Sequence, residues 1–443
     1  MLHPLVAVWV LIAIVLILSQ PRTKAIVPFS LTYFTVPFEQ VLVLGGIHFT
    51  MHQMLILTVL VRMVTFRGVK GKFSGGFNAL DSVAVLWTLS VLIIFLLQWT
   101  EMQAFIKGLG DLVVSLGGYL AARFLIPDRE TLRRTVKVLA AICVIQGVCM
   151  LSEQVTYQNV FAFMGGHPPT IREGHVRAEG SMGTLAGGTF AGVVIPLFFW
   201  MRREEKSQTL ACAGLAGATA MVFASHASTS WLAYGASLVG LAFWPLRRQM
   251  SLVRWALVAI LVALHLTMNG PVWSLIEKID LTGGSSSYHR YMLVDNCIRH
   301  FADWWLIGYK YYGNWGFDMW DLCNQFVVAA LNGGLVTLII FIAIFKRSFG
   351  AIGTARKRVE GDHRQEWFFW CLGSVLFALL VASFGINYMD HLMMWFLLLL
   401  VFISVTTFDA RQTTARREKL TTNVQFAAPG TLIGANPRIS QTM

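Results

Sequence analysis

One uncharged stretch, CNQFVVAALNGGLVTLIIFIAIF at residues 323–345, decides the fold class of this chain. It is longer than the about 20 mostly apolar residues that a helix needs to cross the hydrocarbon core of a bilayer. Lys346 and Arg347 follow it directly, and such positive charges are typical of the cytoplasmic end of a membrane span. The stretch therefore predicts a transmembrane helix.

The composition extends this prediction to the whole chain of 443 residues. Hydrophobic residues make up 56% and charged residues 13%, whereas a soluble chain carries roughly 25% charged residues. Soluble enzymes, nucleic-acid-binding proteins and disordered scaffolds are excluded, because too few polar side chains exist to cover a water-facing surface. We predict an all-α, polytopic integral membrane protein. Its net charge of +12 is expected from cytoplasmic loops, with no nucleic-acid partner.

Twelve other stretches share this apolar character, so we expect thirteen spans, give or take one. They form a single transmembrane domain over 1–407 with two long loops, 152–181 and 269–322. The segment 408–443 mixes charge, Pro and Gly without periodicity and is expected to be a disordered cytoplasmic tail. The thirteen predicted spans are 4–19, 26–45, 47–66, 77–98, 104–126, 132–151, 182–201, 208–224, 229–245, 252–268, 323–345, 366–386 and 390–407.

The distribution of Lys and Arg predicts the orientation of these spans. One alternating set of connections, together with Arg62 at the inner end of its span, holds 28 of the 35 basic residues, and the other set holds the remaining seven. Because cytoplasmic loops carry an excess of Lys and Arg, the first set is expected inside. The N-terminus and both long loops are then outside, and the C-terminus is cytoplasmic.

The first long loop carries Arg172 and Arg177 directly before a glycine-rich helix start at 183–192. The small residues allow neighbouring helices to approach closely. The planar guanidinium group suits phosphate oxygens, and a helix N-terminus adds N–H groups and a positive dipole end. Together they would make an anion site at the outer membrane surface. Alternatively, the arginines pair with Glu173 and Glu179, or extend to lipid headgroups.

The second long loop carries Arg290 on a helix that serines 285–287 can cap and that runs to about His300. Asp321 and Asn324 lie at the mouth of the next helix. Asp321 can act as a general base towards a hydroxyl group, and Asn324 can hold an oxygen atom in place. The alternative is a helix N-cap with its polar neighbour.

Aromatic residues are dense between these positions. Such rings either anchor a segment at the membrane interface or form a stacking platform for sugars. Both interpretations stay open from the sequence. The candidates for sugar stacking are Trp304, Tyr311 and Trp315.

No metal or cofactor is expected. His48 and His52 have the i, i+4 spacing of a metal-binding pair, but no third ligand is evident. The six cysteines have no paired spacing, so they define neither a disulfide framework nor a zinc motif. The cytoplasmic loops lack a nucleotide-binding motif, which places any chemistry outside and without ATP.

Three motifs between residues 170 and 345 resemble the O-antigen ligase and O-antigen polymerase superfamily. The first is D-x-x-N-Q-F at 321–326, which runs on into VVAALNGGLVTLIIF at 327–341. The second, VRAEGSMG at 176–183, opens a small-residue helix, and the third, SHASTSW at 225–231, separates two short helices. The remaining helices agree with the family only in number and hydropathy.

The resemblance implies a GT-C-like membrane glycosyltransferase in the bacterial inner (cytoplasmic) membrane. Its donor would be a glycan linked to undecaprenyl diphosphate, and its acceptor a second glycan or a lipid. Arg177 and Arg290 match the arginines proposed to hold the donor diphosphate, with Arg172 as a further candidate. Such contacts would stabilise the negative charge that builds up on a diphosphate leaving group. Membrane lipids and envelope polysaccharide assembly proteins would be its other partners.

One position departs from the family pattern. Ligases that act on lipid A core usually carry a His–Asn pair where this chain reads Cys323–Asn324. Unless Asp321 or His289 supplies the missing base, this difference favours a polymerase over a ligase. Two other classes stay open, a polysaccharide or lipid transporter and a non-catalytic subunit of an envelope polysaccharide assembly complex. A transporter should carry its charges along the membrane midplane, whereas this chain concentrates them in outer loops.

Overall fold

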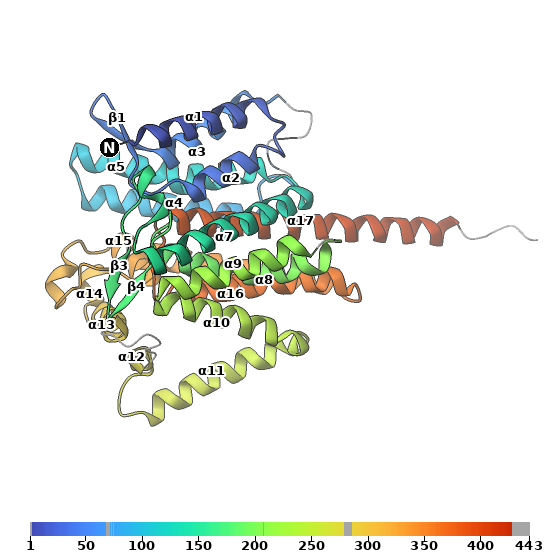
Figure 1. Ribbon diagram of the computed structural model, residues 1–443. Helices are drawn as coiled ribbons and strands as arrows, with labels where there is room; N and C mark the ends of the chain where they lie inside the picture. The colour runs from blue at the N-terminus through green and yellow to red at the C-terminus, as the bar shows by residue number, and fades with distance from the viewer. Residues whose placement is uncertain are drawn as a thin grey trace, which may run out of the picture.

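The computed structural model describes residues 2–67, 71, 73, 75–206, 208–278 and 286–427, with backbone alone at 44, 286 and 411–427. The chain forms a helical bundle (Figure 1), and 75% of the described residues are helical. The α-helices are α1 Pro4–Ser19, α2 Ile26–Thr35, α3 Met51–Thr65, α4 Ala79–Gln98, α5 Met102–Leu112, α6 Gly118–Leu125, α7 Arg129–Thr156, α8 Thr184–Glu204, α9 Thr209–Ser225, α10 Ser228–Ala242, α11 Met250–Thr267, α12 Leu275–Lys278, α13 Ser286–Arg299, α14 Phe301–Trp304, α15 Gln325–Arg358, α16 His363–Ala382 and α17 Asp390–Ala427.

The other elements are short. A π-helix, η1 Val113–Gly117, joins α5 to α6 into one rod. Two antiparallel hairpins pair β1 Val41–Leu44 with β2 Ile47–Thr50 and β3 Thr170–Arg172 with β4 His175–Arg177. The 3₁₀ segments are η2 Val160–Met164, η3 Trp244–Leu246, η4 Val272–Ser274 and η5 Tyr312–Trp315.

Eight helices of the described chain are long and apolar enough to cross a membrane. The predicted all-α, polytopic class is therefore confirmed. Each of the thirteen predicted spans contains a helix, but α1, α2, α3, α9 and α10 fall short of a full span by this measure. Thirteen crossings therefore remain a prediction.

The predicted span 26–45 is wrong in its second half. Helix α2 stops at Thr35 because Pro37 disfavours a helical conformation at Val36, which is extended with φ −77° and ψ 127°. The chain then forms the β1–β2 hairpin. Its turn is Gly45–Gly46, where φ is +58° and +81°, as a two-residue hairpin turn of this hand requires.

The bundle has two distinct ends (Figure 1). The N-terminus, both hairpins and helices α12–α14 lie at one end, here named the loop end. Helix α17 leaves the bundle at the opposite end, here named the tail end. It continues to Ala427, so residues 408–427 of the predicted disordered tail are helical in this structure. Residues 428–443 lie outside the described ranges.

The expected close packing of the glycine-rich helix α8 is confirmed. A Cβ atom added at Gly192 would lie 2.8 Å from the Tyr234 backbone nitrogen of α10. One added at Gly188 would lie 2.3 Å from the Ser230 hydroxyl. Helices α8 and α10 therefore meet at a distance that only glycine permits, which brings the chain before α8 close to the start of α10.

Helix α15 is broken at Gly334, within the uncharged stretch that defines the fold class. Gly334 has φ +66° and ψ −173°, a conformation that strongly favours glycine. The backbone of 305–309 docks against the break: Leu335 N–H donates to the Trp305 carbonyl, and Tyr309 N–H donates to the Leu331 carbonyl, both at 2.8 Å. The second long loop is thereby fixed to the bundle by main-chain hydrogen bonds.

Replacing Gly334 with alanine is expected to destabilise the protein by about 1–3 kcal/mol, the usual cost of a forced backbone conformation. The new Cβ would also lie 2.6 Å from the Leu306 carbonyl oxygen. Thermal unfolding of the purified protein measures the effect. Gly350→Ala, in the same helix with open space around it, is the control and should be neutral or slightly stabilising. Equal unfolding temperatures for the two variants would contradict this account of the break.

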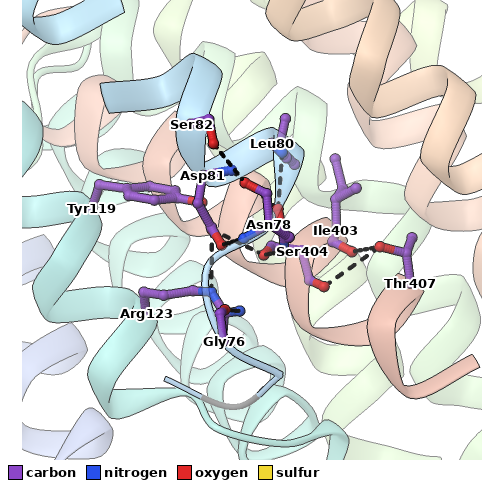
Figure 2. Close-up of polar contacts among 10 residues, drawn as sticks. All are labelled: Gly76, Asn78, Leu80, Asp81, Ser82, Tyr119, Arg123, Ile403, Ser404 and Thr407. Atoms are coloured by element: carbon purple, nitrogen blue, oxygen red, sulfur yellow. Dashed lines mark hydrogen bonds and ion pairs between the residues drawn. The ribbon is translucent and has the colours of Figure 1, made fainter. Parts of the chain in front are cut away.

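A buried polar network joins α4, α6 and α17 near the tail end (Figure 2). Asp81 and Arg123 form an ion pair at 3.3 Å, and both side chains are 2% exposed. The Tyr119 hydroxyl donates to Asp81, and Ser404 Oγ donates to it at 3.1 Å. The Asn78 N–H donates to the other carboxylate oxygen at 2.7 Å. The network therefore fastens three helices that are distant in sequence.

Candidate functional site

Arg177 is positioned by the β3–β4 hairpin and by a carboxylate from a neighbouring helix. It is the last residue of β4 and lies inside the VRAEGSMG motif, 176–183. Glu153 of α7, which is fully buried, accepts hydrogen bonds from the backbone N–H groups of Glu179 at 2.7 Å and Gly180 at 2.9 Å. This side chain holds the irregular segment after Arg177 in place.

The break between α9 and α10 lies beside this segment, at the SHASTSW motif. His226 ends α9 in the left-handed conformation with φ 42°. Its ring stacks on that of His175 in β4, with centroids 4.9 Å apart and planes 12° apart. Burial lowers the pKa of His226, and the nearby His175 and Arg177 lower it further. The predicted break between two short helices is confirmed.

Arg290 reaches the same region from α13. It is 9% exposed, and its Nη2 donates to the hydroxyl of Thr229, in the first turn of α10, at 3.0 Å. It also hydrogen-bonds the Cys323 thiol. Burial raises the pKa of Cys323 to about 11, although the positive charge of Arg290 lowers it in part. The thiol is thus protonated at neutral pH and cannot serve as a base.

The charges of Arg177 and Arg290 act on one another although 113 positions separate them in the sequence. Burial lowers the pKa of Arg177, and the positive charges of Arg172 and Arg290 lower it further. The carboxylates of Glu179 and Glu173 raise the pKa and offset part of this effect. Arg177 Nε is buried and has no hydrogen-bond partner among the described residues. The approach of Arg177 and Arg290 across a shared cavity stays a prediction.

Arg172 has a different setting from the other two arginines. It lies on β3, is exposed, and its Nε is 3.7 Å from a carboxylate oxygen of Glu173. The alternative expectation of local pairing with Glu173 therefore describes Arg172. An exposed pair of this kind contributes little to stability, so Arg172 remains available at the edge of the site.

Asn324, and not Asp321, caps helix α15. The Asn324 side-chain oxygen accepts hydrogen bonds from Phe326 N–H at 2.9 Å and Val327 N–H at 3.2 Å. Asp321 precedes the helix and is exposed. The His289 ring nitrogen Nε2 lies 2.9 Å from the Asp321 carbonyl oxygen. Asn324 is therefore engaged in the fold, whereas His289 and Asp321 are joined through the backbone of Asp321.

The three sugar-stacking candidates have unlike surroundings. Trp304 is 4% exposed and its indole N–H donates to the Cys297 carbonyl at 2.6 Å, so its ring is a core residue. Trp315 stacks on His300 at 4.6 Å between centroids and on Tyr309 at 5.3 Å. Tyr311 is 57% exposed and is the most accessible of the three. A stacking role is compatible with Tyr311 and not with Trp304.

Three further residues belong to this site and were not predicted for it: Thr229, His226 and Gly385. A Cβ atom at Gly385 would lie 2.9 Å from the Thr229 hydroxyl and 3.4 Å from Arg290 Nε, so the glycine makes room for both. The motif at 225–231 was a signal for the first two residues. Gly385 has no such signal, because its role depends on tertiary contact alone.

The arrangement can bind an anion at the loop end of the bundle. It combines two partly or fully buried arginines, a hydroxyl that accepts from one of them, and two stacked histidines. No protein-family model matches the chain, and the comparison with curated proteins finds no match.

Proposed function

We propose that this chain is a membrane glycosyltransferase that acts on undecaprenyl-diphosphate-linked glycans at its loop end. Polymerisation is favoured over ligation because Cys323 occupies the position of the histidine that ligases usually carry. The reaction requires neither a metal nor a nucleotide sugar. The protein would work in the bacterial inner membrane with a glycan or lipid as the acceptor.

The observation that carries this proposal is the convergence of three distant segments on one anion-binding arrangement. Arg177 ends β4, Thr229 lies in the first turn of α10, and Arg290 lies on α13. The Arg177 Nε atom is buried without a partner among the described residues, and an unsatisfied buried donor is costly. A diphosphate oxygen would satisfy it and benefit from a charge-assisted bond.

The proposed reaction makes and breaks one bond at the anomeric carbon of the donor sugar. The bond from that carbon to the diphosphate oxygen breaks, and the diphosphate leaves with the electron pair. The acceptor hydroxyl oxygen forms the new glycosidic bond, and its proton passes to a base. Arg177 and Arg290 would stabilise the leaving group, where negative charge develops.

His289 is the better-oriented candidate for that base. A carbonyl oxygen only accepts hydrogen bonds, so Nε2 of His289 carries the proton that it donates to Asp321 at 2.9 Å. The other ring nitrogen then holds the free electron pair of the neutral imidazole. We expect His289→Gln to lower turnover about 10²–10⁴-fold and Asp321→Asn to leave it nearly unchanged. The reverse result would return the base role to Asp321.

The loop end should face outwards and the tail end the cytoplasm. We predict that a cysteine at Asn314, exposed at the loop end, reacts with an impermeant maleimide added to intact cells. A cysteine at Glu360, exposed between α15 and α16, should react only after the membrane is opened. The native Cys212 is exposed and is first replaced by serine. The opposite labelling would reverse the orientation and remove the proposed site from the outer face.

Glycan profiling of a deletion strain tests the proposed function. A polymerase predicts loss of long chains and accumulation of single repeats on undecaprenyl diphosphate. Accumulation of full-length chains on the same lipid would show a ligase instead. Wild-type protein should restore the profile, whereas Arg290→Lys should not. Donor trapped at the cytoplasmic face would contradict the proposal and favour a transporter.

A further inference from the structure

A second polar region lies away from the arginines, between α4, α5 and the start of η5. It is a cavity of about 560 Å³, and its lining includes Gln98, Lys107, Asp111, Lys310 and Asn332. Neither Arg177 nor Arg290 borders it. The cavity is therefore distinct from the site proposed for the diphosphate.

Two interruptions of helical structure adjoin this cavity. Ser115, which lines it, belongs to the π-helix η1, 113–117, and such π-turns inside helices are frequently found at functional sites. Asn332, on another wall, lies two residues before the break at Gly334. Both irregularities therefore lie in walls of the same cavity, where the backbone departs from regular α-helical geometry.

The cavity is lined by two positive and two negative side chains, and no ion pair within 4.0 Å joins them in the described part of the chain. The charge of Lys107 nevertheless acts on Asp111, four residues further along the same helix. Lys310 Nζ lies 4.6 Å above the Trp99 ring and donates to the Gln98 carbonyl at 3.3 Å. Lys107 Nζ lies 5.7 Å from the centre of the Phe95 ring. The lining also includes two carboxylates, those of Glu101 and Asp111. Neither carboxylate forms a hydrogen bond or an ion pair with another residue in the described ranges.

Two of these charges, Lys107 and Asp111, lie within the rod α5–η1–α6, one of the eight candidate spans. At 1.5 Å per residue, Asp111 lies about 14 Å along the axis from the start of α5, nearly half of the about 30 Å hydrocarbon thickness. Ionised groups at such depth are costly, and they usually face a water-filled or ligand-filled cavity. Lys107 and Asp111 therefore favour a polar ligand or water in the cavity, whereas Lys310 already donates to the Gln98 carbonyl.

Large apolar side chains of α4 and α5 that do not line the cavity are exposed. Side chains on the outside of α4 and α5 are 38–59% exposed although they are large and hydrophobic; they are Ile93, Leu97, Phe105, Ile106 and Leu109. Within a membrane these side chains contact acyl chains. A ligand that suits both surfaces has a polar head and apolar tails.

We infer that this cavity binds the headgroup of a zwitterionic phospholipid, with its acyl chains along α4 and α5. The phosphate would lie near Lys107 and Lys310, and the ammonium group near Glu101 and Asp111. A headgroup with one charge of each sign is attracted by both the lysines and the carboxylates, whereas the carboxylates would repel an anionic headgroup. The inference goes beyond the proposed glycosyl transfer and does not depend on it.

Native mass spectrometry of the full chain, titrated with phosphatidylethanolamine or phosphatidylglycerol, tests this inference. The wild-type protein should retain phosphatidylethanolamine about tenfold better than phosphatidylglycerol, a difference of about 1.4 kcal/mol. Lys107→Gln combined with Asp111→Asn should remove this preference. Gln103→Trp, at an exposed lining position, should block binding while all four charges remain.

The matched control is Glu277→Gln combined with Lys278→Gln, an exposed pair in α12 at the same end of the bundle. It removes the same charges and should retain phosphatidylethanolamine as the wild type does. Unchanged retention in both cavity variants would overturn the inference, as would equal binding of phosphatidylglycerol. A co-purified adduct with the mass of a polyprenyl-diphosphate sugar would also overturn it and assign the cavity to the enzyme's own lipid-linked substrate.

Discussion

Arg177→Lys and Arg290→Lys should each lower turnover of the lipid-linked donor about 10²–10³-fold, the scale seen when one charge-stabilising donor is removed from a transition state. Lysine keeps the charge but lacks the planar fork that binds two oxygens at once. At position 290 the planar guanidinium group hydrogen-bonds both the Thr229 hydroxyl and the Cys323 thiol, and lysine lacks this geometry. Initial rates with reconstituted protein and a purified lipid-linked donor provide the measurement.

Arg299→Lys is the matched control for this pair. Arg299 lies on the same helix as Arg290, its side chain is 70% exposed, and its Nε pairs with Asp295 at 2.6 Å. Because it faces away from the proposed site, its substitution should leave turnover within about twofold, as is typical of exposed ion pairs worth under about 1 kcal/mol. Full activity in both Arg177→Lys and Arg290→Lys would refute the proposed grip on the diphosphate.

The helices were predictable from the sequence because the bilayer imposes a simple requirement. A spanning segment must be apolar and must satisfy its own backbone hydrogen bonds. The stretch at 323–345 contains no charged residue, so its apolar character is evident from the sequence. The errors arose where local chemistry overrides hydropathy. Pro37 ends α2 early, and the Gly45–Gly46 turn between two apolar runs was a hairpin signal that the hydropathy of 26–45 concealed.

The site was predictable only in part, for a different reason. Arg177 and Arg290 were identified by residue type and by their places in the outer loops. The helix-cap alternative was considered for Asp321, but α15 begins at Gln325 and the capping residue is therefore Asn324. Gly334 lies in one of the motifs that resemble the family. The docking of 305–309 against it depends on a tertiary contact, which the sequence pattern does not reveal.

Asp81→Ala is expected to be the most destabilising of the substitutions considered. Removing one partner of a buried ion pair costs about 3–5 kcal/mol, because the other charge loses its buried counter-charge. Here the carboxylate also accepts hydrogen bonds from Tyr119, Ser404 and the Asn78 backbone (Figure 2). Arg123, 1% exposed, would keep its charge in the core. Thermal unfolding in detergent should show a large fall in unfolding temperature.

Two companion variants separate the charge from the hydrogen bonds. Ser82→Ala, one residue further on, removes only a hydroxyl that donates to the Asn78 carbonyl at 3.1 Å and should unfold like the wild type. Asp81→Leu combined with Arg123→Met replaces the ion pair by apolar side chains, an exchange that is often neutral or stabilising. Because Tyr119 and the Asn78 N–H still lose their acceptor, we expect partial recovery. If the double variant were no more stable than Asp81→Ala, the uncompensated charge would not be the cause. The loss would then belong to the hydrogen bonds that join α4, α6 and α17.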